Sequence, residues 1–481
     1  MHRKGKDKND RQEEIIVPKS KTLCILLLCL FLALAACGRG DANNGEYMPT
    51  PDNHVLTVLA QRDLADFIRY AETSMAQTRE AQGLDFSIEL TTYDIAQAEE
   101  QRLRLGTMLM AGQGYDLIFL NHRHPLWSYG QSGFFEDIFT LMDQNPTTHR
   151  DDFFSNILDA FTVNGALYVF PFNFGFEYVG INASLPTAFI DAFLQLDSIS
   201  YTQALQMYLD LQAGYADEME HLKLADAASF IFPLHMLWNI SSGFIDFVQG
   251  ISRLNTPDFV LTLELLQQMY VDNPPPQVVY TGGSIQTLLD PQRNPAQYVF
   301  SVLSAFPGSL YALFPPESSH FLHYIPLADE SGRPILLNMS HQPTQMVSIA
   351  QGPHSALAWE FVQHLIPAFT ATANTPPRPG RTIDPTMSMY TPIVRSLFHE
   401  HFTTVFQTYQ ERWGVRPMRF PERQDAALER LLAYNQMPIV PIPWVPTELL
   451  STSLERLMQG VISPQEAAQQ MHNAVSLWLI E

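Results

Sequence analysis

Apolar segments of strand length alternate with segments of helical period in the first part of the folded chain. Residues 54–59 and 85–90 have the length and composition of strands, and residues 115–120 form the run typical of a buried strand. Residues 63–80 and 95–111, which lie between these runs, have helical periodicity. Strands that alternate with helices of this length predict βαβ units and a parallel sheet. The chain is therefore expected to have an α/β fold.

Polar residues follow the third predicted strand directly. Parallel sheets bind ligands beyond the carboxyl ends of their strands. This places Asn121, His122 and Arg123 at a potential ligand site, although the same residues also suit an ordinary surface loop. His122 and His124 alone are a weak metal signature, because no Cys or carboxylate stands beside them. We expect neither a metal nor a cofactor.

Aromatic residues occupy every second position of a segment near residue 170. Period two would place all of them on one face of an extended chain. They are Tyr168, Phe170, Phe172, Phe174, Phe176 and Tyr178. Pro171 and Gly175 interrupt the run, so a crossing segment is expected rather than one uniform central strand. Most of these rings are expected in the core, with about two at a ligand cleft.

The rest of the chain is mostly helical up to residue 270 and mixed beyond it. Further strands are predicted at 298–306, 321–327 and 346–349. A helix follows with Trp359, Val362 and Ile366 at helical spacing. The last helix is predicted to begin with Ser463 as N-cap, Pro464 at N1 and Glu466 at N3, and to bury a stripe of apolar side chains. The stripe consists of Ala467, Met471, Val475 and Trp478.

The amino terminus has the pattern of an export signal. Lys19 and Lys21 precede an uncharged apolar run at 23–36, which is short for a membrane span. Leu34-Ala35-Ala36-Cys37 resembles the bacterial lipobox, in which cleavage before the cysteine exposes it for lipidation. Residues 1–36 are thus predicted to be a lipoprotein signal peptide and the small, polar residues 37–53 a flexible tether. An uncleaved anchor with a chance Cys37 is the alternative; both place the body outside the cytoplasm, at a membrane.

Cysteine usage and charge exclude several classes of function. The chain has three cysteines, Cys24, Cys29 and Cys37, so no disulfide framework or thiol nucleophile is expected after residue 37. Residues 1–36 hold seven of the 28 Lys and Arg and four of the 50 Asp and Glu, which leaves a net charge of −25 for the remainder. Such a charge disfavours nucleic acid and acidic lipid surfaces. An acyl chain rather than a basic face must then hold the protein at the membrane.

Five separated stretches resemble one protein family in the order in which they occur. They are LMAGQGYDLIFL, YGQSGFFEDI, NGALYVFPFNF with GIN, ALAWEFVQHLI and GVISPQEAAQQMHNAV. Together they resemble the family 1 extracellular solute-binding proteins, the capture subunits of ABC importers, and in particular the maltose-binding type. The resemblance extends from about residue 55 to the end of the chain.

The resemblance implies a two-lobe, periplasmic-binding-protein-like (type II) fold with a hinge and an interlobe ligand cleft. It implies that residues 54–170 and 321–370 form the first lobe, and that residues 175–315 and 385–481 form the second. It also implies a small-molecule ligand, most simply a sugar or oligosaccharide, and permease subunits in the membrane as partners.

Further ligand contacts are expected on the crossing segment and in the second lobe. Phe172, Asn173 and Glu177 combine a ring, an amide and a carboxylate, which suits a sugar. Trp238 and Asn239 lie where relatives place a ligand aromatic, although a core tryptophan has equal weight. Trp444 stands between prolines and aligns loosely with a cleft-lining segment of the family. The other tryptophans, Trp127, Trp359 and Trp478, are expected in the core.

Catalytic motifs do not occur in the sequence. It contains no Gly-x-Ser-x-Gly, His-Glu-x-x-His, phosphate loop or dinucleotide fingerprint. The leading hypothesis is thus a lipid-anchored, outward-facing receptor that closes on its ligand and is not an enzyme. A surface enzyme acting on polysaccharide, and a sensor or adhesin on the same fold, remain as alternatives.

Overall fold

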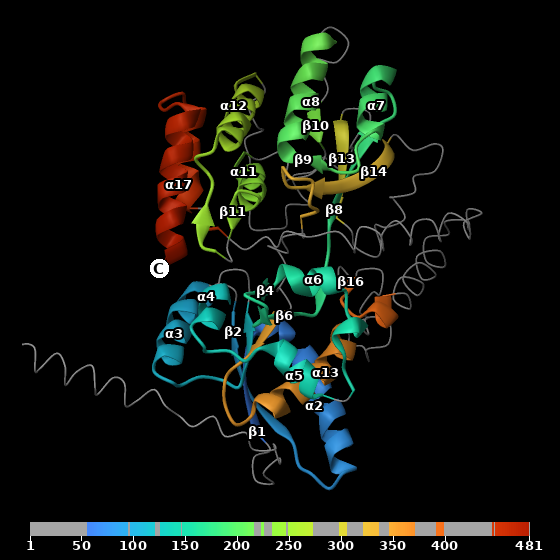
Figure 1. Cartoon of the computed structure of the whole chain (residues 1–481), viewed down its shortest axis with the longest axis vertical. Coiled ribbons are helices and arrows are strands. Elements are labelled where there is room, and N and C mark those ends of the chain that lie inside the picture. Colours follow the sequence, from blue (N-terminus) through green and yellow to red (C-terminus); the bar gives the residue numbers. More distant parts are fainter. Residues whose placement is uncertain are drawn as a thin grey trace, which may run out of the picture. The chain divides into compact units, whose positions relative to one another are not determined.

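A computed structural model describes most of the chain after residue 54. The described residues are 55–94, 97–120, 126–145, 147–215, 223–225, 233–246, 249–272, 298–304, 321–335, 346–370, 391–398, 445–446 and 448–480. Two five-stranded sheets organise these residues (Figure 1).

The first sheet has the strand order β2-β1-β3-β15-β6. Its strands are β1 (Val55–Gln61), β2 (Ser87–Tyr93), β3 (Leu117–Leu120), β15 (Met346–Ile349) and β6 (Phe170–Pro171). Strand β1 runs parallel to both β2 and β3, as the βαβ pattern predicts. Strand β15 is antiparallel to β3 and β6. The carboxyl ends of β1, β2, β3 and β6 consequently lie at one edge, where β15 begins.

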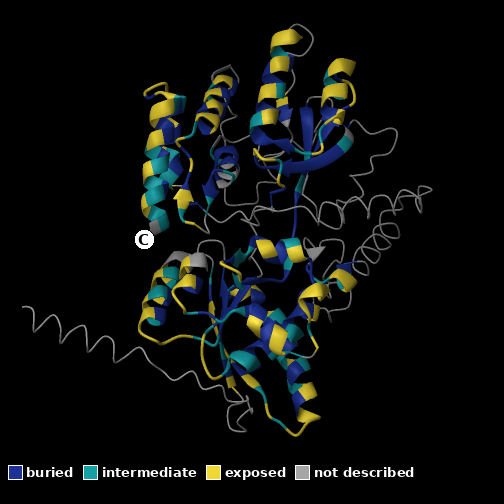
Figure 2. Ribbon diagram, viewed as in Figure 1, coloured by how far each residue is buried: buried dark blue, intermediate teal, exposed yellow. Residues whose placement is uncertain are grey.

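Amphipathic helices flank this sheet and supply its core. Helix α2 (Ala65–Glu80) packs against α13 (Ser355–Thr370), and α3 (Ala98–Met110) connects β2 to β3. Ile68, Ala71 and Met75 recur at helical spacing on α2 and are buried. The predicted stripe on α13 is confirmed, because Trp359, Val362 and Ile366 are all buried in the same hydrophobic cluster. Figure 2 shows buried strands beneath helices whose outer faces are exposed.

The second sheet has the strand order β10-β13-β8-β14-β9. Its strands are β8 (Glu177–Asn182), β9 (Ile199–Ser200), β10 (Lys223–Ala225), β13 (Tyr298–Ser304) and β14 (Phe321–Ala328). The central strand β8 is antiparallel to β13 and β14. The outer strands β10 and β9 are parallel to β13 and β14 respectively.

Helices that are distant in sequence cover the second sheet with one core. They are α7 (Thr187–Leu194), α8 (Tyr201–Gly214), α11 (Pro233–Ser242), α12 (Pro257–Asp272), α16 (Glu448–Met458) and α17 (Pro464–Ile480). The predicted start of α17 is confirmed: Ser463 N donates to Glu466 Oε2 over 2.9 Å, and Glu466 N donates to Ser463 Oγ over 3.2 Å. Ala467, Met471 and Val475 are buried, and Trp478 packs against the cluster.

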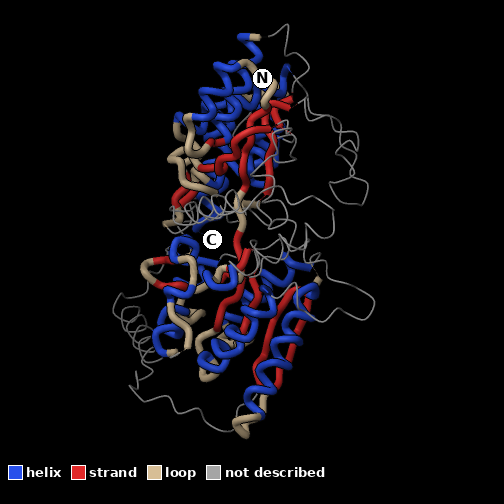
Figure 3. The backbone as a smooth tube through the Cα atoms, turned by 90° about the vertical axis from the view of Figure 1, so that its right-hand side faces the viewer, coloured by secondary structure: helices blue, strands red, loops and turns tan. Residues whose placement is uncertain are grey.

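A crossing segment joins the two sheets, as its interrupted pattern predicts. After β6 the chain forms β7 (Asn173–Phe174), which pairs with β16 (Thr391–Pro392), and then enters β8 (Figure 3 traces the chain). The expectation of one aromatic face is wrong in detail. Phe170 through Tyr178 pack in the core of the first sheet and the crossing segment, whereas Tyr168 packs in a smaller separate cluster.

One predicted lobe boundary needs correction. Residues 321–328 were expected in the first lobe, but they form β14, which pairs with β8 and β9 in the second sheet. The backbone hydrogen bonds of β14 therefore belong to the second sheet, and the chain returns to the first sheet after it, before β15. The other lobe boundaries stay predictions.

The remaining elements are short. They are η1 (Arg62–Leu64), α4 (Leu126–Gln131), α5 (Ile138–Gln144), η3 (Arg150–Asp152), α6 (Ser155–Ala160), β4 (Thr162–Val163), β5 (Ala166–Leu167), β11 (Ile245–Asp246) and β12 (Ile251–Ser252). None of the helices in the described part of the chain combines the length and the apolar character that crossing a membrane requires.

Candidate functional site

The strand ends of the second sheet converge on the first residue of β8. Because β13 and β14 are antiparallel to β8, their carboxyl ends lie where β8 begins: Ser304 is paired with Glu177, and Pro326 with Tyr178. Strands β9 and β10 run parallel to these neighbours and end at the same edge. Ligands of α/β sheets bind beyond such carboxyl ends. The edge around Glu177 is therefore the candidate site of the second sheet.

Glu177 carries a carboxyl group with an altered affinity for protons. Burial raises its pKa to about 7, and a hydrogen bond of 3.3 Å from Tyr201 Oη to Oε2 opposes this rise in part. Tyr201 is the first residue of α8 and is itself buried. A carboxyl that changes protonation near neutral pH accepts hydrogen bonds when it is ionised and donates one when it is protonated.

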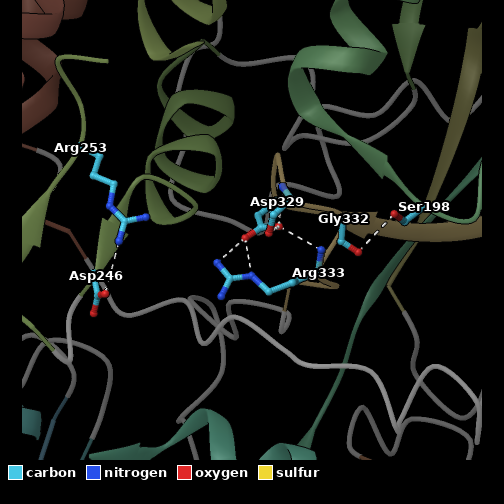
Figure 4. A network of polar contacts seen from close by, with 7 residues as sticks. Ser198, Asp246, Arg253, Asp329, Gly332 and Arg333 are labelled. Carbon is cyan, nitrogen blue, oxygen red and sulfur yellow. Dashed lines mark hydrogen bonds and ion pairs between the residues drawn. The ribbon is translucent and has the colours of Figure 1, made fainter. Parts of the chain in front are cut away.

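A tight hairpin at the end of β14 holds an arginine in a fixed orientation (Figure 4). Asp329 Oδ2 accepts hydrogen bonds from Arg333 Nε over 2.9 Å and from Arg333 Nη2 over 2.6 Å. Asp329 Oδ1 accepts from Ser331 N, Ser331 Oγ and Arg333 N. The side chain of Asp329 is 2% exposed, whereas that of Arg333 is 47% exposed. The carboxylate thus forms the buried centre of the hairpin, and the guanidinium lies at its surface.

Glu330, the neighbour of Asp329, ties the hairpin to the start of α8. Its two carboxylate oxygens accept hydrogen bonds from Ser200 Oγ over 2.8 Å and from Thr202 Oγ1 over 2.6 Å. Ser200 is also the N-cap of α8, with a capping box to Gln203. A carboxylate near a helix N-terminus is stabilised by the helix dipole. The hairpin is therefore attached to the helix whose first residue contacts Glu177.

Helix α11 ends beside the same hairpin. Gly243, which follows α11, lies so close to Asp329 that a Cβ atom added to the glycine would be 3.2 Å from Asp329 Cβ. Trp238 and Asn239 lie on α11; their side chains lie outside what the structure describes. The helix that carries these two predicted residues thus belongs to the neighbourhood of the site.

The corresponding edge of the first sheet is also polar. At the end of β1, Gln61 Nε2 donates to Asp63 Oδ2 over 3.3 Å. At the end of β2, burial raises the pKa of the Tyr93 hydroxyl to about 12, and the charge of Asp63 adds to the rise. Arg62 Nη2 and Asp94 Oδ2 form an ion pair of 3.0 Å between the two strand ends. The described residues at the ends of β1 and β2 thus offer both hydrogen-bond donors and acceptors.

The predicted contacts other than Phe172, Trp238 and Asn239 fall into two groups. Asn121, His122, Arg123 and Trp444, like the predicted lipidation site Cys37, lie outside the described residues. Glu177 lies at the candidate site, and Asn173, which is partly buried, lies on β7 of the crossing segment. These contacts remain predictions.

Phe172 requires a correction. Its side chain is 1% exposed and packs against Phe369 with ring centroids 4.6 Å apart, and against Phe170 at 5.3 Å. The aromatic crowding of the first core holds the ring away from solvent, so Phe172 is a core residue in this structure. Trp359 is a core residue, as predicted, and Trp127 has no described side chain.

Three residues of the site escaped the sequence-based prediction: Tyr201, Asp329 and Arg333. The sequence Asp329-Glu-Ser-Gly-Arg333 directly after a predicted strand is a turn signal that would have located the hairpin. No sequence pattern would have paired Tyr201 with Glu177, because the contact depends on how α8 packs on the sheet.

The site is equipped for binding polar groups. It combines carboxylates, hydroxyls and one oriented guanidinium, all of which form hydrogen bonds with hydroxyl-rich molecules. Within the described ranges, no three His, Cys, Asp or Glu side chains lie close enough together to hold a metal ion.

Solved structures of other proteins share this fold. The sugar-binding protein MalE from Xanthomonas citri is 13% identical and aligns with a TM-score of 0.55 over 89% of this chain and 97% of its own. UspC from M. tuberculosis is 14% identical, with a TM-score of 0.51 over 88% and 99%. An extracellular solute-binding protein family 1 member from Alicyclobacillus acidocaldarius is 11% identical, with a TM-score of 0.50 over 91% and 100%.

No protein-family model matches the chain, and no curated protein sequence matches it. At identities of 11–14% the likeness concerns the fold, and it extends over almost the whole length of each solved structure. The chain has the two-lobe α/β fold of the extracellular solute-binding proteins of family 1, as its resemblance to that family predicts.

Proposed function

We propose that this protein is a solute-binding receptor that captures a carbohydrate and delivers it to the permease of an ABC importer. The observation that carries the proposal is the convergence of strand ends in the second sheet on Glu177, at the point where the crossing segment enters that sheet. In a fold of this kind, a ligand that contacts both lobes favours the closed state through its differential affinity.

The proposal includes a lipid anchor at Cys37. The predicted lipobox at 34–37 and the polar segment that follows it support this assignment. The receptor would face outward from the cell membrane, held by acyl chains rather than by basic residues. A Cys37→Ala variant is expected to lose incorporation of labelled palmitate and to leave the membrane fraction. Palmitate labelling that persists in this variant contradicts the proposed anchor.

Binding is tested with the full chain purified in detergent. The probes are maltotriose, cellotriose, xylotriose and raffinose, with trialanine as a non-carbohydrate comparison. A ligand at 100 times its dissociation constant stabilises the folded state by about 2.7 kcal/mol, which thermal unfolding detects. We expect at least one glycan to raise the melting temperature and to change the tryptophan fluorescence as the lobes close. If none of the four glycans does so, the carbohydrate proposal is wrong.

The same samples separate binding from catalysis. A receptor returns its glycan unchanged, so the bound probe is expected to be recovered intact after prolonged incubation, as chromatography would show. Recovery of shortened glycan would favour an enzyme acting on polysaccharide. Such an enzyme needs two carboxyl groups at glycosidase spacing.

A further inference from the structure

The orientation of Arg333 is set before any ligand arrives. Its Nε and Nη2 atoms both donate to one oxygen of the buried Asp329. Backbone bonds close the hairpin around this pair, because Asp329 N donates to Arg333 O over 2.9 Å and Gly332 N donates to Asp329 O over 2.9 Å. Immobilising a flexible side chain on binding costs conformational entropy. Much of that cost has already been met for Arg333 by folding.

The bond pattern leaves part of the guanidinium available. A guanidinium carries five N–H donors in a rigid plane. The hydrogen bonds to Asp329 use the Nε–H and one Nη2–H. The side chain of Arg333 is nonetheless 47% exposed, and the donors on Nη1 point away from the Nε edge that faces Asp329. Arg333 can therefore donate to a second partner without releasing Asp329.

The charges around Arg333 decide which partner suits it. Asp329 already balances the guanidinium charge, and Glu330, its neighbour in the hairpin, adds a further carboxylate at the same strand edge. An anionic ligand would meet like charges there, whereas a hydroxyl-rich neutral ligand both accepts from the guanidinium and donates to the carboxylates. The chain after residue 36 has a net charge of −25, which points the same way.

We propose that Arg333 contacts the ligand and determines specificity, by donating from its outer edge to hydroxyl oxygens of a neutral sugar. This inference rests on the proposed function and names a residue and a ligand class for the same site. Asp329 is the positioning residue, because it acts only through the orientation of Arg333.

The test compares variants of Arg333 with a matched arginine on the same part of the chain. Arg253 is similarly exposed and pairs with Asp246 at 3.5 Å, in the β11–β12 hairpin. Arg333→Met removes all the donors, and Arg333→Lys keeps a cation beside Asp329 but loses the planar fork. Isothermal titration of the full chain uses the four neutral glycans above and trigalacturonate as an acidic probe. Melting temperatures without ligand establish that each variant is folded.

We expect the wild-type chain to bind a neutral glycan and not trigalacturonate. Both Arg333 variants should bind that glycan about 10- to 100-fold more weakly, which is the range expected for hydrogen bonds to a charged donor. Arg253→Gln should bind within about threefold of the wild type, because Arg253 pairs with Asp246 at the separate two-stranded β11–β12 hairpin and not with Asp329. Loss of this exposed ion pair should also leave the protein folded.

Three results would overturn the inference. If the wild type and the folded Arg333 variants bind a glycan with equal affinity, Arg333 does not contact the ligand. The proposed function is not affected by that result. If the wild type binds trigalacturonate more tightly than the neutral glycans, only the inference of a neutral ligand is wrong. Failure of the wild type to bind any of the glycans contradicts the proposed function, and this inference fails with it.

Discussion

Tyr201 Oη lies 3.3 Å from Glu177 Oε2 and connects the first residue of α8 to the first residue of β8. The contact joins the crossing segment to the body of the second sheet. It also partly compensates the burial of a carboxyl group whose pKa is nevertheless raised to about 7.

Glu177 should make stability fall as the pH rises from about 4.5 to about 7. The carboxyl of the unfolded chain releases its proton near 4.5, whereas the folded carboxyl keeps it up to about 7. Between these values the native state binds more protons, so the free energy of unfolding decreases with pH and reaches its lower level above 7. The contribution is about 3 kcal/mol at most. Glu177→Gln should flatten this pH dependence in urea unfolding, whereas Glu455→Gln, at an exposed position on α16, should leave it unchanged.

Asp329→Ala should destabilise the protein by about 1–3 kcal/mol, because it leaves the Ser331 and Arg333 backbone donors of the hairpin without their acceptor. Urea unfolding at pH 7 measures the change. The control is Asp246→Ala, which removes a longer and more exposed ion pair to Arg253 and a single exposed hydrogen bond from Gln249 N, and which should therefore cost less than Asp329→Ala. Equal losses in the two variants would mean that the burial of Asp329 has no energetic weight.

Gly180→Ala should destabilise the second sheet by about 1–3 kcal/mol through overpacking. A Cβ atom added at Gly180 on β8 would lie 2.6 Å from the ring of Tyr324 on β14, and both strands are central. Urea unfolding measures the loss. The double variant Gly180→Ala/Tyr324→Leu removes the ring that the added Cβ would meet. Its loss of free energy of unfolding should therefore be smaller than the sum of the losses in the two single variants. Gly214→Ala, at the last residue of α8, is the control, since its added Cβ would meet no described residue outside its own helix backbone and chain neighbours within 4 Å.

Thr57→Val should destabilise the first sheet by about 1–3 kcal/mol although the side chain keeps its shape. Thr57 Oγ1 donates to Asp116 Oδ2 over 2.7 Å and accepts from Asp116 N over 3.0 Å, which joins β1 to the start of β3. Thr78→Val on α2 removes only an exposed bond to Ser74 O and should change stability by less than about 0.5 kcal/mol. Chemical unfolding of both variants measures the two changes in the free energy of unfolding. A decrease at Thr57→Val as small as that at Thr78→Val would show that water replaces the hydrogen bonds between Thr57 and Asp116.

Local patterns predicted the elements well where one signal dominated. Residues 346–349 are a strand with those bounds, and the cap at Ser463 and Glu466 is formed as the sequence indicates. The structure of the aromatic run was harder to predict from the sequence. A period of two describes one continuous strand, whereas the strand pairing is broken near Pro171 and Gly175 into β6, β7 and β8. The rings consequently pack in more than one place, and Phe172 is in the core.

The sequence by itself determined the α/β class and the presence of Glu177 in a polar and aromatic crossing segment, and it predicts an export signal. Those features depend on neighbours in the chain: helical and strand periods, a charged and then apolar amino terminus, and residue types at alternate positions. Only the tertiary structure decided that β14 joins the second sheet, that Tyr201 contacts Glu177 and that Asp329 and Arg333 lie at the same edge. The physical reason is that strand pairing and packing bring together residues that are separated in the sequence, by 24 positions for Tyr201 and Glu177 and by 130 for Ser200 and Glu330. No local pattern records which partner a strand or a buried carboxylate will have.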